Sequence, residues 1–335
     1  MELTPPFPID QLRESIFRDF APTAAEARLV QTLIEREVPP IINSQTLSLI
    51  LGVSHKLLWA MASVPDRYYR RFQIPKRSGG TRDIATPRVF LKVVQRWILL
   101  NILYRRPLPP FVTGFVPGRG LLNNASFHVR RRYLAKVDVQ DFFPSIGFHQ
   151  VAGVYRDFGF PESVVVLLAR LSLLGEVLPQ GAPTSPYLAN LVFLPCDGEI
   201  IALANHHQVA YSRYADDLTF SSDAPIGGDF IAQVVRLIEG HSFRINRQKL
   251  RSSGPGQRLM TTGMVVNVTA HPVRRLRRQL RARFHQAEVN PGNFAGQSHQ
   301  LLGWAAYVNM YDRELGSRYL SIAERVLGPS RNKGN

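Results

Sequence analysis

The sequence predicts an α+β fold in which helical segments flank a β-rich middle region. Apolar residues recur at helical spacing through the first 70 residues, and β-prone runs that end in acidic residues lie between 131 and 268. The remaining residues return to helical spacing and are rich in arginine. At 335 residues the chain is long enough to bury a substantial core. We therefore expect a mixed fold with helices at both ends.

The composition indicates a polyanionic partner. Lysine and arginine exceed aspartate and glutamate by 41 to 25, which gives a formal net charge of +16. Nucleic acid is the usual partner of such a chain, and an anionic membrane surface is the rival. No apolar run approaches the ~20 residues that a spanning helix needs, and we see no signal peptide. The single cysteine, Cys196, excludes an intrachain disulfide, so we expect a cytoplasmic protein without a membrane partner.

The segment 1–70 is predicted to be helical. Residues 24–37 carry apolar side chains at helical spacing, and two further helices are expected on either side of Gly52. A Leu-Gly-Val-Ser junction of this kind also occurs in helix-turn-helix regulators, so a nucleic-acid-binding regulator is an alternative function. The second of these helices carries the run 57–61, Leu-Leu-Trp-Ala-Met, which is too apolar to read base edges. A structural helical hairpin is therefore favoured.

A basic hairpin follows. Two β-prone runs flank Gly79-Gly80, and the turn brings Lys76 and Arg82 together. A lysine point charge and an arginine fork on such a hairpin suit a triphosphate, whereas a solvated basic hairpin is the alternative. Residues 87–103 then predict an amphipathic helix. Its expected core residues are Phe90, Val93, Val94, Trp97, Ile98 and Ile102.

Three carboxylates are the candidate catalytic residues. Asp138 follows the β-prone run 134–137, and Asp216 and Asp217 lie in a turn between two further β-prone runs. Adjacent carboxylates repel each other, and a divalent cation with oxygen ligands relieves that repulsion. Taken alone, the turn is better explained as a solvated one. Together with Asp138, it would hold two Mg²⁺ ions about 4 Å apart, with Mn²⁺ as a substitute.

The order of these segments resembles the palm of reverse transcriptases. That family has an acidic strand, then a Pro-Gln-Gly loop, here 178–186, and then an Ala-Asp-Asp hairpin. The resemblance covers roughly residues 70–310. It implies a right-hand polymerase with fingers and part of the palm at 71–130, a β-sheet palm with the catalytic hairpin at 131–268, and a helical thumb at 269–335.

The same resemblance implies RNA-directed DNA synthesis. Asp138, Asp216 and Asp217 would be the catalytic and metal-binding residues. Phe143 would lie beneath the sugar of the incoming nucleotide and exclude ribonucleotides, with a core phenylalanine as the alternative. Lys249 would lie near the leaving pyrophosphate, with a surface lysine as the alternative. The residues assigned to the nucleotide are Lys76, Arg82, Asp141, Phe143, Gln180 and Lys249.

Two short segments resemble the extra motifs of retron reverse transcriptases. Asn124-Ala125 and His128 precede the first catalytic strand, although a capped, polar helix start explains them almost as well. The segment 261–263 is similar to the family's Val-Thr-Gly, with Thr261 in place of valine. The helix 273–284 combines one apolar stripe with many arginines, which suits a thumb that follows a nucleic-acid backbone. The residues expected to contact RNA are Asn124, His128, Thr262, Gly263, Arg274, Arg277, Arg278 and Arg281.

A retron-type enzyme is expected to make a branched, RNA-linked single-stranded DNA from its own structured non-coding RNA, in phage defence. The implied partners are that RNA template and primer, the DNA product, deoxynucleoside triphosphates, a host ribonuclease H and an effector or toxin protein. The alternatives are another bacterial reverse transcriptase, either group II intron-like or an untemplated defence polymerase, and the nucleic-acid-binding regulator.

Overall fold

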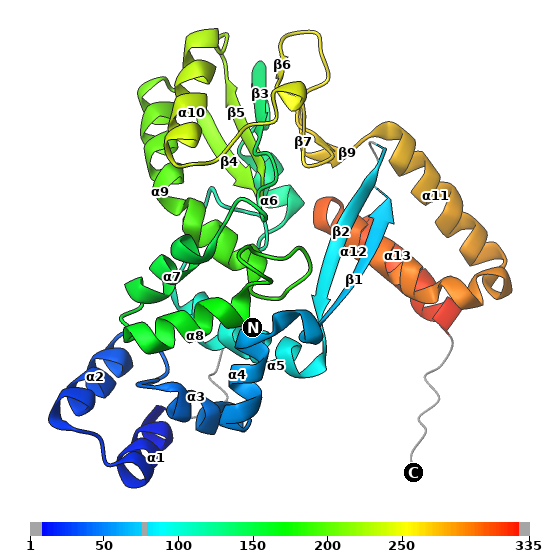
Figure 1. Ribbon diagram of the computed structural model, residues 1–335. Helices are drawn as coiled ribbons and strands as arrows, with labels where there is room; N and C mark the ends of the chain where they lie inside the picture. Colours follow the sequence, from blue (N-terminus) through cyan, green and yellow to red (C-terminus); the bar gives the residue numbers. More distant parts are fainter. Residues whose placement is uncertain (1–8, 76–78, 328–335) are drawn as a thin grey trace.

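The computed structural model describes residues 9–75 and 79–327, and its N-terminal region is helical (Figure 1). Three of the helices begin at a residue whose side chain accepts a backbone N–H bond, which stabilises the first turn: Thr23, Asn43 and Ser54. The third helix ends at Gly52, whose φ of +63° suits glycine. Helices therefore lie where the spacing predicts them. They are α1 (Ile9–Phe20), α2 (Ala24–Glu35), α3 (Ser44–Leu51) and α4 (His55–Ser63).

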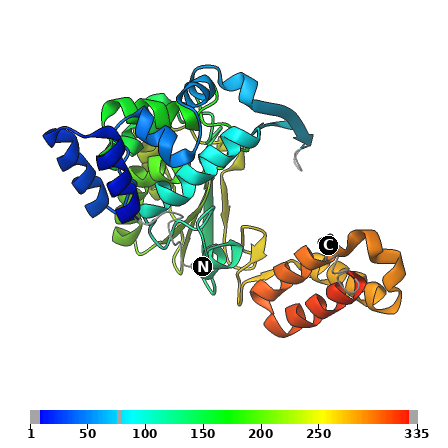
Figure 2. The same ribbon diagram turned by 90° about the horizontal axis from the view of Figure 1, so that it is seen from below.

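The basic hairpin is present as predicted. Strands β1 (Tyr69–Pro75) and β2 (Thr81–Pro87) pair in antiparallel register. Gly79 and Gly80 in the turn have φ values of +89° and +77°, which glycine adopts without steric cost. The hairpin projects away from the body of the protein (Figure 2). A projecting hairpin of this kind can reach a ligand that lies beside the central sheet.

Helix α5 (Val89–Asn101) differs from the prediction in the face that it buries. Val94 and Ile98 are buried as expected, but Phe90 and Val93 are 63% and 60% exposed. Apolar residues occur on two adjacent faces of this helix, and only one of them meets the core. The expectation that Phe90 and Val93 are core residues was therefore wrong.

The central sheet is antiparallel throughout and has the strand order β4-β5-β3-β6. Its strands are β3 (Tyr133–Asp138), β4 (Ala210–Tyr214), β5 (Asp217–Ser222) and β6 (Arg251–Ser253). The long helices α9 (Ser185–His206) and α10 (Gly228–Gly240) lie on its flank. Phe230 of α10 meets Phe220 of β5 with 5.3 Å between ring centroids. The remaining helices of this region are α6 (Leu121–Ser126), α7 (Phe148–Asp157) and α8 (Glu162–Ser172).

A small third sheet spans the predicted boundary between palm and thumb. It has the order β7-β8-β9, with β7 (Met260–Thr261), β8 (Met264–Val265) and β9 (His271–Pro272). A separate apolar cluster joins this sheet to α6 and to β3 through Ala125, Leu134, Leu259, Met264 and Val266. The chain that enters the C-terminal helices is thereby packed against the strand that carries Asp138.

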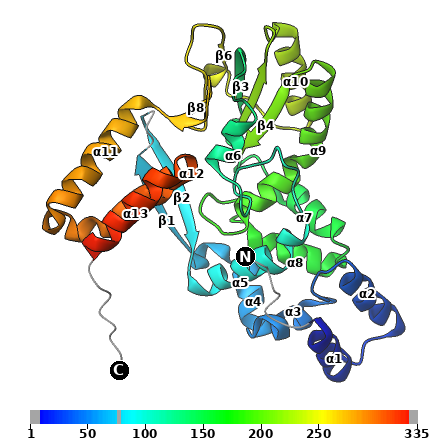
Figure 3. The ribbon, with the colours of Figure 1, turned by 180° about the vertical axis from the view of Figure 1, so that it is seen from behind.

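The C-terminal helices form a bundle with its own core. These helices are α11 (Arg274–Val289), α12 (Ser298–Tyr311) and α13 (Arg313–Leu327). Leu280 and Phe284 are buried as the spacing predicts, and the Phe284 ring stacks on Tyr319 with 3.9 Å between centroids. Figures 2 and 3 show this bundle set apart from the central sheet and the N-terminal helices. A helical module with a separate core is therefore attached through the small sheet.

Helix α9 is a core helix despite its length. Among the described residues, α9 is the one helix that is by itself long and apolar enough to cross a membrane. Helices α3 and α4 reach that length and apolar character only when they are counted together, and they are sharply bent relative to each other. Within α9, 56% of the apolar window is buried inside the protein. Packing against the sheet therefore accounts for its apolar character.

Candidate active site

The candidate site is built on the hairpin of β4 and β5. Tyr214 pairs with Asp217, so Ala215 and Asp216 form a two-residue turn, as the sequence predicts. Ala215 has a φ of +58°, a conformation that glycine usually supplies at the first position of such a turn. Backbone strain of this kind costs about 1–3 kcal/mol and persists only where the surroundings hold it. The turn is therefore held in place by contacts outside the hairpin.

The sheet register brings the three predicted carboxylates to one end of the sheet. Strand β3 runs antiparallel to β5, and Asp138 lies directly opposite Asp217. The backbone N–H of Val139 donates to the carbonyl oxygen of Asp216 at 3.0 Å. Asp138, Asp216 and Asp217 are thus neighbours although the chain between them is long.

Burial and mutual repulsion oppose the ionisation of carboxylates at this end of the sheet. The pKa of Asp216 is raised to about 6, first by burial and then by the negative charges of Asp138 and Asp217. Burial also raises the pKa of Asp138, against the lowering effect of Lys249. The charged forms of Asp138 and Asp216 are therefore unfavourable unless a cation compensates them.

Lys249 is the cation that meets Asp138 in this structure. It ends the short helix η3 (Arg247–Lys249), and its Nζ donates to both carboxylate oxygens of Asp138 at 2.8 Å. Burial opposes the charged form of Lys249, but the hydrogen bond to Asp138 and the surrounding aspartates outweigh it and raise the pKa of Lys249. The sequence placed Lys249 near the reaction but not on Asp138. Its contact with a leaving pyrophosphate stays a prediction.

The donor set has the chemistry of a site for a hard divalent cation. Three carboxylates supply only oxygen ligands, which Mg²⁺ and Mn²⁺ prefer. Within residues 9–75 and 79–327, no three histidine, cysteine or acidic side chains are gathered into a preformed metal cluster. Because Lys249 bonds both oxygens of Asp138, a metal ion and the Lys249 ammonium would compete for the same ligand.

Phe143 lies beside the hairpin of β4 and β5. It is half-buried, and its ring is 6.3 Å from that of Phe115, which in turn lies 6.2 Å from the ring of Tyr214. The adjacent Phe142 is 4% exposed and belongs to the core. The exposed part of Phe143 is available to a substrate at the end of the sheet, and its role in sugar selection stays a prediction.

The Pro-Gln-Gly loop packs against the projecting hairpin. The carbonyl oxygen of Gln180 accepts the backbone N–H of Ala85 in β2 at 2.8 Å. Gly181 has a φ of +119°, and a Cβ there would lie 2.9 Å from the Ala85 carbonyl oxygen. Glycine is therefore required for this approach, which fixes Gln180 relative to the strand that carries Arg82. Lys76 lies outside the described residues.

Asp141 lies next to the carboxylates, on the rim of an open cavity of about 950 Å³. It is exposed and has a φ of +47°. Arg244 and Arg247 also line the cavity, together with Glu239, so its walls carry charges of both signs. The predicted contact of the Asp141 backbone with a triphosphate stays a prediction.

Asn124 and His128 lie in the interior, where the sequence led us to expect RNA contacts. Both side chains are 0% exposed. Asn124 Nδ2 donates to the hydroxyl oxygens of Thr113 and Ser212 at 3.0 and 2.8 Å. The two ring nitrogens of His128 contact the hydroxyls of Ser212 and Ser221, each at 2.7 Å. The expected direct contact with RNA is therefore corrected: these side chains bind β4 and β5, and the fold leaves no surface of theirs for a ligand.

His128 is held in its neutral form. Burial lowers the pKa of His128 to about 3, and the charges of Arg131 and Lys136 act in the same direction. A neutral imidazole has one donor and one acceptor nitrogen, which matches its two hydroxyl partners.

The segment 261–263 meets the same buried cluster. The hydroxyl of Thr261 donates to Asn124 Oδ1 at 3.0 Å and contacts the hydroxyl of Thr219 at 2.9 Å. Thr262 and Gly263 form the turn between β7 and β8, with φ values of +47° and +79°. Thr262 is half-buried and donates to a backbone carbonyl of α6, whereas Gly263 is exposed. A contact of Thr262 or Gly263 with RNA stays a prediction.

The predicted RNA-binding arginines lie on α11, beside its buried stripe. Arg274, Arg278 and Arg281 are exposed, and Arg277 is half-buried. The helix therefore presents guanidinium groups at the surface of the C-terminal bundle, as the sequence predicts.

Three residues that the sequence reasoning missed support the turn between β4 and β5. Arg213, Asp197 and Asn190 are all 0% exposed and form one hydrogen-bonded network. A signal for the first two was available: each is a charged residue, of opposite sign, in a largely apolar strand or helix. Such charges are buried only when they are paired.

The comparisons with known proteins agree with this geometry. A family model described as "Reverse transcriptase (RNA-dependent DNA polymerase)" matches residues 74–266. The chain is 35% identical over 319 residues to the retron Mx162 reverse transcriptase of Myxococcus xanthus. The aligned region covers 83% of this chain and 66% of that protein. It is 37% identical over 271 residues to the retron Mx65 reverse transcriptase of the same organism, and this alignment covers 75% of this chain and 63% of that protein.

A relative from Escherichia coli is matched over nearly its whole length. The retron Ec86 reverse transcriptase is 30% identical over 304 residues, covering 87% of this chain and 92% of that protein. The chain spans about two thirds of the two Myxococcus relatives. The family match contains the three carboxylates, the Pro-Gln-Gly loop and Lys249. This chain therefore belongs to the reverse transcriptase family and, within it, to the retron-type reverse transcriptases.

Proposed function

We propose that the protein is an RNA-directed DNA polymerase of the retron type. The observation that carries the proposal is the placement of Asp138 opposite Asp217 and beside Asp216, at one end of the central sheet. The net charge of +16 and the exposed arginines of α11 suit a nucleic-acid substrate. The family match and the retron relatives support the same activity.

In the proposed reaction, a primer hydroxyl attacks the α-phosphorus of a deoxynucleoside triphosphate. The new O–P bond forms as the bond to the β-phosphate oxygen breaks, and pyrophosphate leaves. Asp138, Asp216 and Asp217 would hold two Mg²⁺ ions, which, when bound, activate the hydroxyl and neutralise charge on the phosphates. Mn²⁺ is the expected substitute.

The remaining predicted residues orient the nucleotide. Arg82 on the projecting hairpin, with Lys76, would neutralise the triphosphate, and Phe143 would exclude a 2′-hydroxyl from the sugar position. Lys249 would exchange Asp138 for the departing pyrophosphate and donate hydrogen bonds or a proton to it. Gln180 and the backbone of Asp141 would border the same nucleotide.

The finer proposal concerns template, primer and partners. We infer that the template is the protein's own structured non-coding RNA and that the primer is a 2′-hydroxyl within it, which leaves DNA joined to RNA by a 2′-5′ branch. Contacts with paired RNA would follow its shape and its 2′-hydroxyls. The further partners are a host ribonuclease H that removes template and an effector or toxin protein that acts in phage defence. The expected location is the cytoplasm.

Expression with the neighbouring RNA tests this proposal. The protein should copurify with a branched RNA–DNA molecule, and debranching enzyme should release its DNA. The Asp216→Asn variant, prepared in parallel, should carry the RNA without DNA. A DNA product that starts from an ordinary 3′-end would leave the polymerase standing and overturn the retron-type priming. Synthesis that proceeds equally well without any RNA would instead indicate an untemplated polymerase.

A further inference from the structure

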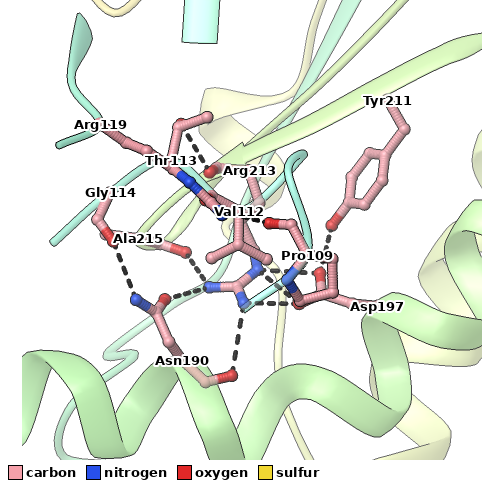
Figure 4. A network of polar contacts seen from close by, with 10 residues as sticks. All are labelled: Pro109, Val112, Thr113, Gly114, Arg119, Asn190, Asp197, Tyr211, Arg213 and Ala215. Atoms are coloured by element: carbon pink, nitrogen blue, oxygen red, sulfur yellow. Dashed lines mark hydrogen bonds and ion pairs between the residues drawn. The ribbon is translucent and has the colours of Figure 1, made fainter. Parts of the chain in front are cut away.

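The strand that leads into the catalytic turn carries a fully buried arginine, Arg213, on the side that faces α9 (Figure 4). Its Nη2 meets Asp197 Oδ2 of α9 at 2.5 Å, and its Nε donates to both oxygens of Asp197 at 2.9 and 3.1 Å. The hydroxyl of Tyr211 donates to Asp197 Oδ1 at 2.6 Å. The hydrogen bonds between Arg213 and Asp197, together with the one from Tyr211, therefore hold the ion pair in one orientation.

The same guanidinium reaches the strained turn. Arg213 Nη1 donates to the carbonyl oxygen of Ala215 at 3.1 Å and to Asn190 Oδ1 at 2.8 Å. The peptide unit that this bond holds joins Ala215 to Asp216. Because Ala215 has a positive φ, the bond restrains a conformation that the hairpin alone would not favour.

The opposite side of the turn is fixed through the same network. Asn190 Nδ2 donates to the carbonyl oxygen of Gly114 at 2.8 Å. A Cβ at Gly114 would lie 2.6 Å from the backbone nitrogen of Ala215, so this glycine lies directly against the turn. The Arg213 backbone is bonded on its outer edge as well, by the N–H of Thr113 at 2.9 Å. Helix α9 is thus linked to the turn in two ways, through the Arg213 guanidinium and through Gly114.

A buried, charged network of this kind is not explained by a gain in folding stability. Burying two charges incurs a large desolvation penalty, and well-packed apolar residues often stabilise a core as much or more. The geometry therefore points to a positional role. α9 begins within the Pro-Gln-Gly loop 178–186, so the network also connects the turn to the segment that carries Gln180.

We propose that Arg213 is a positioning residue for catalysis. Anchored on α9 by Asp197, it holds the Ala215 carbonyl and so sets the direction in which Asp216 presents its carboxylate beside Asp138. The inference rests on the proposed catalytic role of Asp216. It predicts that loss of the network misplaces a metal ligand without unfolding the protein.

The test replaces the charges with apolar side chains of similar size, in the double variant Asp197→Leu and Arg213→Met. Such exchanges are often neutral or stabilising, so the melting temperature should be kept. We expect kcat for primer extension to fall by on the order of 10²-fold, since about 1 Å of displacement has that effect. The KM for the deoxynucleotide should change far less. Binding of Mn²⁺ to the free protein, followed by electron paramagnetic resonance, should weaken about tenfold.

A gentler pair of variants serves as the matched control. Tyr211→Phe removes one bond to Asp197 and keeps the ring that stacks on Phe220 at 5.1 Å. Tyr155→Phe removes an equally buried hydroxyl, which contacts Ser172 at 2.8 Å on α8. Tyr211→Phe should lower kcat and Mn²⁺ affinity several-fold at unchanged KM, and Tyr155→Phe should change neither. This pair decides the question if the double variant does not fold.

The outcomes distinguish the positioning role of Arg213 from the proposed catalytic role of Asp216, on which it rests. Wild-type kcat and Mn²⁺ affinity in a folded double variant, or equal effects of the two tyrosine variants, would overturn the positioning role. If Asp216→Asn remains active, the proposed catalytic site itself is wrong. If Asp216→Asn is inactive while the network variants are fully active, the positioning role of Arg213 is rejected and the catalytic role of Asp216 is kept.

Discussion

At Asp216, burial and two neighbouring carboxylates act in the same direction. Both raise its pKa, to about 6, so the ionised side chain opposes folding in the metal-free protein. Asp216→Asn keeps the shape and removes the charge. We expect DNA synthesis to fall to background while the free energy of unfolding without metal rises by on the order of 1–3 kcal/mol, at about 1.4 kcal/mol per pKa unit. Primer extension and chemical denaturation measure the two effects.

The control for this prediction is metal-dependent stability. Adding Mg²⁺ should stabilise the wild-type protein more than Asp216→Asn, because the variant has lost a ligand. Substantial polymerisation by the variant would contradict the assignment of this hairpin as catalytic.

Phe143 and Phe142 are adjacent in sequence but differ in exposure, which makes them a matched pair. Phe143 is half-buried beside Phe115, whereas Phe142 is 4% exposed and in the core. Phe143→Ala should therefore leave a folded enzyme and raise ribonucleotide incorporation relative to deoxynucleotide incorporation. Phe142→Leu should reduce stability by about 1 kcal/mol and leave that ratio unchanged. The ratio of kcat/KM values for the two sugars is the measurement. A folded, active Phe143→Ala enzyme with wild-type selectivity would place the sugar gate elsewhere.

Among the elements, the hairpin of β4 and β5 is joined to α6 and β7 by buried polar side chains. His128 takes part in these contacts through Ser212 and Ser221. Its pKa is lowered from 6.5 to about 3, first of all by burial. The unfolded chain therefore takes up a proton near pH 6.5 that the folded protein resists. Stability is fully present above that pH and is lost as the pH falls toward 3, by up to about 1.4 kcal/mol per pH unit.

Replacing His128 with glutamine removes the titrating group and keeps hydrogen-bonding capacity. Below pH 6.5, His128→Gln should lose stability more slowly with falling pH than the wild type does. At pH 7.5 it should be the less stable of the two, because an amide fits the two serine hydroxyls less well. Urea unfolding between pH 5 and 7.5 gives both comparisons, and parallel pH profiles would show that His128 is not buried in neutral form.

The elements that the sequence predicted are those encoded by neighbouring residues. Two β-prone runs around a two-residue turn predicted the catalytic hairpin, and Gly79-Gly80 predicted the projecting one. The partners of buried polar residues are set by the folded chain. Asn124 bonds Ser212, 88 residues away, and Thr261, 137 residues away. No local pattern contains that pairing, so an interior residue was interpreted as an RNA contact.

Over the whole molecule, the arginine-rich bundle is a separate module at the end opposite the N-terminal helices (Figure 1). A net charge of +16 would attract RNA from any side, so charge alone does not identify the binding surface. The position of the arginines identifies that surface, because counterions are released only where guanidinium groups meet phosphates.

The last prediction separates these two effects with variants of equal charge. Replacing the exposed Arg274, Arg278 and Arg281 of α11 with glutamine should flatten the slope of log affinity against log salt, by about 0.7–0.9 for each lost phosphate contact. Replacing the exposed Arg13, Arg18 and Arg28 of α1 and α2 changes the net charge equally and should leave the slope unchanged. Fluorescence anisotropy with the structured RNA measures both. Equal flattening in the two triple variants would mean that net charge controls the affinity, and a slope altered only by the N-terminal variants would place the RNA on the opposite end of the protein.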